Sequence, residues 1–154
     1  MAETKIESAV ERIPYDIHTV FCVLSHLKIL EKIKEQLPAE QTQKMEEKIQ
    51  ELEFGEDFIR VKVDGLGQKI CMRIVEQEEN KTLKFGFENL PLDMNFWIQF
   101  KEVAPQQTAI KLTLKVDMPF MFKMMLPDKK LQEGTDQAAK MLAQLPYVNL
   151  LQWV

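Results

Sequence analysis

From about residue 50 onwards, apolar and polar residues alternate along five segments of the chain. The segments are residues 57–63, 69–76, 82–88, 94–103 and 108–117. Seventeen positions of one parity are all apolar, whereas only four of the seventeen neighbouring positions are hydrophobic. This period of two predicts an antiparallel sheet with one buried and one solvated face. Gly, Pro and Asn between the segments predict turns, and Leu52 and Phe54 predict a short additional strand.

The part of the chain before residue 50 shows three different patterns. Residues 5–12 alternate, with Ile6, Ser8 and Val10 on one side, and predict a first strand. After it, apolar residues at helical spacing predict one helix that starts at Pro14 and a second that ends at Pro38. The glutamate-rich stretch between Pro38 and the sheet predicts a solvated helix or a charged loop.

A long helix is predicted at the C-terminal end, because apolar residues between 131 and 145 recur in steps of four and three. Six or seven strands about 4.8 Å apart make a sheet roughly 25–30 Å wide. One helix with its side chains is only about 10–12 Å across. We therefore expect an α+β fold in which a curved antiparallel sheet of six to seven strands wraps around the C-terminal helix. The length of 154 residues predicts a single domain over 1–154.

Local motifs add a family resemblance to this element order. At the N-terminal end they are Ile13-Pro14-Tyr15, Val20-Phe21, Leu24-Ser25 and Leu30 before Pro38, and the closing stretch is Leu112 to Phe120. In this order they resemble the START-like (Bet v 1-like, SRPBCC) helix-grip superfamily over residues 5–145. His26 departs from the pattern, since an Asp or Asn is common there. The resemblance implies a helix-grip fold, and its members include lipid and hormone carriers, polyketide cyclases and chaperone-linked modules.

The space between sheet and C-terminal helix is the candidate site, because binding sites for small molecules are concave and mostly apolar. We expect it to bind a small, largely apolar molecule, lipid-like or polycyclic, without chemical change. The alternative for the same residues is a solid core. The expected lining consists of Phe85, Phe87, Phe96, Ile98, Phe100, Leu112, Leu114, Met118, Phe120, Met124, Leu131, Thr135, Ala138 and Leu142.

Two further apolar segments suggest partner binding as an alternative function. Residues 119–127 place six large apolar side chains around one lysine, and are interpreted as a mouth of the cavity, a lipid- or partner-binding patch, or a packed first turn. The tail, residues 146–154, is interpreted as docking on its own domain or, with Trp97, across a homodimer.

Catalytic and metal-binding patterns are sparse. His18, Cys22 and His26 have the spacing of metal ligands, but no fourth ligand accompanies them, so neither metal nor cofactor is expected. A cyclase- or hydrolase-type enzyme would need acid–base groups at the cavity mouth, such as His18, Asp93 or Asp117. The sequence has no Walker loop and no nucleophile elbow.

Charge and composition narrow the expected partners and compartment. A net charge of −4 argues against nucleic acid as a partner. The longest uncharged run is too short and too polar for stable membrane insertion. The charged N-terminal residues and the low cysteine count predict a cytoplasmic protein.

Overall fold

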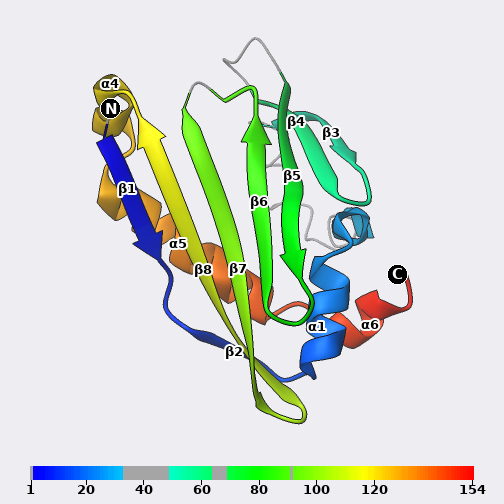
Figure 1. Ribbon diagram of the computed structural model, residues 1–154. Helices are drawn as coiled ribbons and strands as arrows, with labels where there is room; N and C mark the ends of the chain where they lie inside the picture. The colour runs from blue at the N-terminus through cyan, green and yellow to red at the C-terminus, as the bar shows by residue number, and fades with distance from the viewer. Residues whose placement is uncertain (1, 33–48, 64–68, 91) are drawn as a thin grey trace.

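An antiparallel sheet of eight strands forms one layer of the molecule (Figure 1). The computed structural model describes residues 2–32, 49–63, 69–90 and 92–154. The strands are β1 (Ala2–Glu7), β2 (Glu11–Ile13), β3 (Ile49–Phe54), β4 (Phe58–Val63), β5 (Lys69–Glu78), β6 (Thr82–Glu88), β7 (Asp93–Ala104) and β8 (Gln107–Met118). Their order is β1-β8-β7-β6-β5-β4-β3, and β2 pairs with β8 beyond the end of β1.

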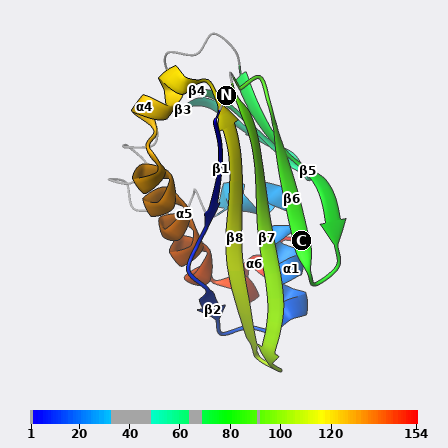
Figure 2. The same ribbon diagram turned by 60° about the vertical axis from the view of Figure 1, so that its left-hand side comes forward.

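Helices cover one face of this sheet, as the second view shows (Figure 2). They are α1 (Ile17–Leu24), the short 3₁₀ helix η1 (Leu27–Ile29), α4 (Phe120–Met125), α5 (Asp128–Ala143) and α6 (Tyr147–Leu151). The long helix α5 packs mainly on β8, β1 and β2, and α1 packs against α6. None of the helices in the described part of the chain is long and apolar enough to cross a membrane.

The α+β fold class predicted from the sequence is confirmed. The alternation of apolar and polar residues in the strands arises, as predicted, because one face of the sheet is buried. In β6 and β8, most side chains of the apolar parity are buried, for example Leu83, Phe85 and Leu112. The register places Ile98 opposite both Leu83 and Leu112, so apolar residues meet on one face across three strands. Burial of a single face therefore imposes the period of two.

The predicted first strand is wrong in its extent, because residues 5–12 belong to two strands with a break between them. Ser8 lies at this break, where its hydroxyl oxygen accepts a hydrogen bond of 2.9 Å from the main-chain N–H of Leu112. Val10 was expected on the same side of the strand as Ile6, which is buried, but Val10 is 61% exposed. The main-chain N–H of Ser8 still donates to Leu112 and Ser8 is buried, but the chain leaves the pleat after Ser8, so the alternation of the sequence no longer decides which side chains are buried.

Helix α1 begins later than Pro14, where it was predicted to start. Asp16 is the N-cap, and its carboxylate accepts hydrogen bonds from the main-chain N–H of Thr19 at 3.1 Å and from the Thr19 hydroxyl at 2.6 Å. These bonds satisfy donors that a helix leaves unpaired at its first turn. They also lower the pKa of the Asp16 carboxyl, with the bond from the Thr19 side chain as the largest cause.

The predicted second helix is described only in its first part. The structure shows η1 followed by helical residues 30–32. The remainder of that prediction, the glutamate-rich stretch up to residue 48 and the turn at 64–68 lie outside the described residues.

Candidate functional site

The fourteen residues expected to line the interior fall into three groups by exposure. Seven are buried: Phe85, Ile98, Phe100, Leu112, Leu114, Met118 and Thr135. Five are partly buried: Phe87, Phe96, Leu131, Ala138 and Leu142. Phe120 and Met124 are 73% and 76% exposed, so their expected place in the interior is wrong. They belong to α4, a helix of one and a half turns without a buried residue.

The buried residues form two separate hydrophobic clusters. The larger one joins α1, α6 and the C-terminal half of α5 to the sheet around Leu83, Phe85 and Leu112. The smaller one lies around Leu114 and Met118, where Leu131 of α5 packs against it. Phe96 borders both clusters and is itself only partly buried. The apolar interior is thus closely packed at its two ends, and Phe96 lies between them.

A third part of the same sheet face is apolar but less well covered. We call it the open face, and it consists of Val61, Ile70, Met72 and Phe87, all partly buried, of which Met72 also packs against the edge of the larger cluster. Val61 lies opposite Ile70, and Met72 lies opposite Phe87, so these residues form a continuous surface over β4, β5 and β6. Val61, Ile70 and Met72 were absent from the predicted lining, although their parity in the alternation already placed them on this face.

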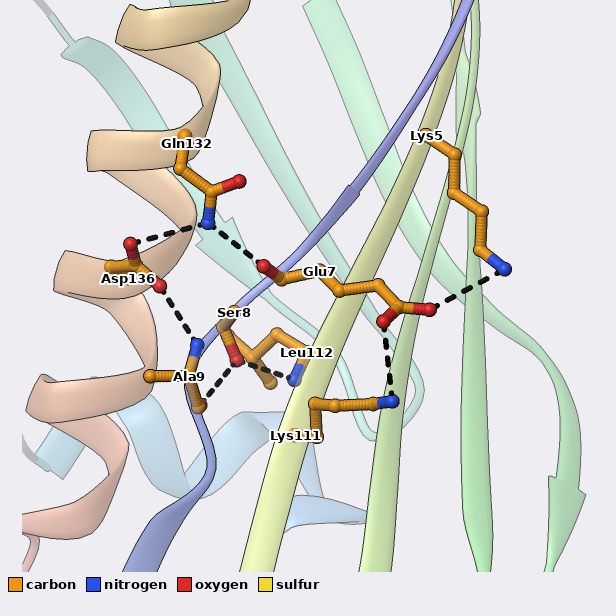
Figure 3. Close-up of polar contacts among 8 residues, drawn as sticks. All are labelled: Lys5, Glu7, Ser8, Ala9, Lys111, Leu112, Gln132 and Asp136. Atoms are coloured by element: carbon orange, nitrogen blue, oxygen red, sulfur yellow. Dashed lines mark hydrogen bonds and ion pairs between the residues drawn. The ribbon is translucent and has the colours of Figure 1, made fainter.

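The position of α5 explains why the open face has less cover. The main-chain N–H of Ala9 donates to Asp136 at 2.9 Å, and the side chain of Gln132 donates to the main-chain oxygen of Glu7 at 2.8 Å (Figure 3). Gln132 also donates to Asp136 at 3.2 Å. These contacts, here called the α5 anchor, hold the helix against the break between β1 and β2. Since β1 and β2 lie at the opposite end of the strand order from β4, the anchor keeps α5 away from the open face.

Polar groups near the interior are mostly engaged in the fold itself. The hydroxyl of Thr135 donates to the main-chain oxygen of Leu131 at 2.7 Å, which leaves only its oxygen lone pairs for a ligand. The pKa of the Asp136 carboxyl is lowered, and the largest cause is the hydrogen bond that it accepts from the main-chain N–H of Ala9 in the α5 anchor. Burial raises the pKa of Tyr147, whose hydroxyl donates to the main-chain oxygen of Leu142 at 2.6 Å.

The candidate acid–base residues do not converge on the apolar face. Asp93 and Asp117 lie opposite each other in the register of β7 and β8, with the parity of the outer face of the sheet. His18 and Cys22 line a hollow of about 230 Å³ beside α1, whereas His26 lines a separate hollow of about 240 Å³ beside η1. Within the part of the chain that the structure describes, no three His, Cys, Asp or Glu side chains could hold a metal ion together.

The C-terminal tail docks on its own chain, which is one of the two predicted arrangements. Tyr147 is fully buried, and its ring lies 5.7 Å from that of Tyr15 in an edge-to-face arrangement. Leu150 is buried beside it in the larger cluster. Trp97 lies elsewhere, in a hollow of about 200 Å³ that also contains Lys5 and Lys115. The structure therefore gives Trp97 no part in the docking of the tail.

Comparison with solved structures shows that the chain has the Bet v 1-like helix-grip fold. Truncated norcoclaurine synthase from Thalictrum flavum superposes with a TM-score of 0.67 at 10% identity, covering 92% of this chain and 91% of that one. A protein from Rhizobium loti gives 0.63 at 10% identity, covering 92% and 96%. A protein from Thermus thermophilus gives 0.61 at 15% identity, covering 97% and 99%.

No protein-family model matches the chain, and no curated protein sequence matches it. The likeness is therefore one of fold.

Proposed function

We propose that this helix-grip chain binds a small, largely apolar molecule, lipid-like or polycyclic, without changing it chemically. The ligand would lie between the open face and α5, against Phe87 and Phe96. The observation that carries this proposal is a continuous apolar surface over β4–β6 that is only partly buried, beside a helix anchored at the other edge of the sheet. Apolar surface with few polar groups is what small-molecule sites typically offer.

The chemistry of the face supports binding in preference to catalysis. General acid–base catalysis requires a titratable group within reach of the substrate. On the described strands β4–β8, the inward-facing positions contain one such residue, Glu102, which is exposed near the end of β7 and opposite Thr108. Affinity would come from burial of apolar area at about 25 cal/mol per Å², reduced by the cost of ordering the ligand.

One structural neighbour is known to bind small molecules of this general class. Norcoclaurine synthase from Thalictrum flavum has been solved in complex with dopamine and hydroxybenzaldehyde, and that structure superposes with a TM-score of 0.64 at 11% identity. In that protein, the fold accommodates small aromatic molecules. We extend only the ligand class to this chain, since the identity is far below the level at which a site could be transferred.

Two measurements test the proposal. Native mass spectrometry of the full chain should detect a bound small molecule after gentle purification. Displacement of a hydrophobic dye by fatty acids, sterols and polycyclic aromatics should then rank the ligand classes. Phe87→Ala should weaken dye binding, whereas Val75→Ala, at an exposed position in β5, should not. The proposal fails if no compound displaces the dye or raises the melting temperature, or if both variants bind as the native chain does.

A further inference from the structure

Helix α4 exposes an unusual amount of apolar surface for so short an element. Phe120, Met121, Met124 and Met125 are 73%, 75%, 76% and 70% exposed. Phe122 is partly buried and packs against the smaller cluster, which fixes the helix to the end of the sheet. Figure 1 shows α4 at one extremity of the molecule, beyond the end of β8. The exposed apolar side chains thus lie on a short element at one end of the sheet.

The charge around α4 is opposite to that of the whole chain. Residues 119–130 contain three lysines and one aspartate, a net charge of +2, whereas the chain carries −4. Lys129 and Lys130, in the first turn of α5, are exposed, and Lys123 is partly buried. The aspartate, Asp128, accepts a hydrogen bond of 3.4 Å from the hydroxyl of Thr4. None of the three lysines forms an ion pair with another described residue.

We propose that α4 inserts its exposed phenylalanine and methionine side chains into the surface of a bilayer that contains anionic lipid. Apolar side chains enter the boundary between headgroups and acyl chains, while lysines beside them bind anionic headgroups. This arrangement lies on the membrane and does not span it.

Shape and charge favour a bilayer over a second copy of the chain. The exposed residues share one side of α4, because positions i, i+1, i+4 and i+5 fall within about 140° around a helix axis, so they can enter a bilayer surface together while lipids rearrange around them. A symmetric contact of α4 with α4 would also place the lysines of one copy against those of the other, and like charges repel. The proposal does not depend on whether the interior holds a ligand.

Cosedimentation of the full chain with vesicles tests this inference. Phosphatidylcholine vesicles with and without phosphatidylserine should be compared at low and high salt. We expect stronger binding to the anionic vesicles, and weaker binding as salt screens the lysines. Met121→Ser combined with Met124→Ser should lower the partition coefficient at least about tenfold. Lys129→Glu combined with Lys130→Glu should lower binding to anionic vesicles at least about 25-fold, since each lysine near such a surface contributes about fivefold and each new glutamate is repelled by it.

Matched controls separate these effects from general changes in hydrophobicity or charge. Met141→Ser removes a methionine that is 56% exposed near the other end of α5, and Lys101→Glu reverses an exposed lysine of β7. Both should bind vesicles as the native chain does, and all variants should keep the native melting temperature to within a few degrees. Binding to neither kind of vesicle would overturn the proposal, as would equal binding of the double methionine variant. If the native chain has the mass of a dimer in solution and the double methionine variant has the mass of a monomer, a second copy covers α4 instead.

Discussion

Two phenylalanines of β6 offer a matched test of which part of the apolar face is packed and which part is open. Phe85 and Phe87 lie two residues apart on the same strand, with the same parity. Phe85 is 2% exposed, and its ring centre lies 5.7 Å from that of Phe96. Phe87 is partly buried, lies opposite Met72 and belongs to neither buried cluster. Residue type, strand and face are therefore constant, and only the packing differs.

Replacement of each phenylalanine by alanine should have unequal effects on stability. Loss of a fully packed phenylalanine lowers the free energy of unfolding by about 3–5 kcal/mol, because a cavity remains. Phe87→Ala should lower it by about 1–2 kcal/mol, since part of its transfer free energy is not gained on folding. For a chain of this size, each kcal/mol changes the melting temperature by about 2–4 °C. We therefore expect the Phe85→Ala variant to melt several degrees below the Phe87→Ala variant.

Equilibrium urea unfolding, followed by far-ultraviolet circular dichroism, measures this difference. Phe87→Ala should also lose affinity for a hydrophobic dye, although it remains the more stable variant. Equal losses of stability in the two variants would refute the reasoning, because the open face would then be as closely packed as the rest of the interior.

Three further predictions concern local features of the fold. Asp16→Ala should lower the free energy of unfolding by about 1 kcal/mol at neutral pH through loss of the helix cap. The folded-state pKa of this carboxyl is lowered, so its contribution is present above the unfolded pKa and is lost as the pH falls through the folded value. The difference in unfolding free energy between native chain and Asp16→Ala should therefore shrink in acid urea titrations, and Asp16→Asn should behave almost as the native chain. Tyr147→Phe should cost about 1 kcal/mol in urea unfolding, because it leaves a main-chain carbonyl of α5 without its donor; no change would mean that the hydroxyl contributes nothing. Gly134→Ala should raise the melting temperature by about 2–4 °C, since an added Cβ meets nothing within 4 Å and alanine favours the helix by about 1 kcal/mol. A melting temperature below that of the native chain would show that the added methyl group does not fit.

The alternation of the sequence predicted the central strands well, because burial of one face constrains every second residue. Leu83 and Phe85 in β6, and Leu112 in β8, are buried as their parity required. The same rule failed at Val10, which is 61% exposed. There, the Ser8 hydroxyl oxygen accepts the main-chain N–H of Leu112 where the pairing of β1 with β8 breaks, and a pattern of apolar residues contains no signal for such a contact.

The failure at Phe120 and Met124 has a different physical cause. The hydrophobicity of residues 119–127 suggested burial, but Pro119 and Pro127 flank a helix of only six residues. In the described part of the chain, Phe122 is the residue of that short helix that packs against a buried cluster, whereas Phe120, Met121, Met124 and Met125 remain exposed. A hydrophobic composition favours burial of a segment, but only the tertiary structure decides whether the chain offers a surface against which the segment can pack.

The α5 anchor connects these observations, because it determines which apolar part of the sheet α5 leaves uncovered. Periodicity identified one face of α5 correctly in part, with Thr135 buried and Leu131 and Leu142 partly buried. It did not place the helix on the sheet, since that position depends on the polar residues Gln132 and Asp136 and their bonds to the break between β1 and β2. A helix fixed at that edge is too narrow to cover β4–β6 as well. The partly buried apolar surface on those strands therefore follows from polar contacts at the opposite side of the molecule, and weakening the anchor should alter binding of the proposed ligand without any change in the open face itself.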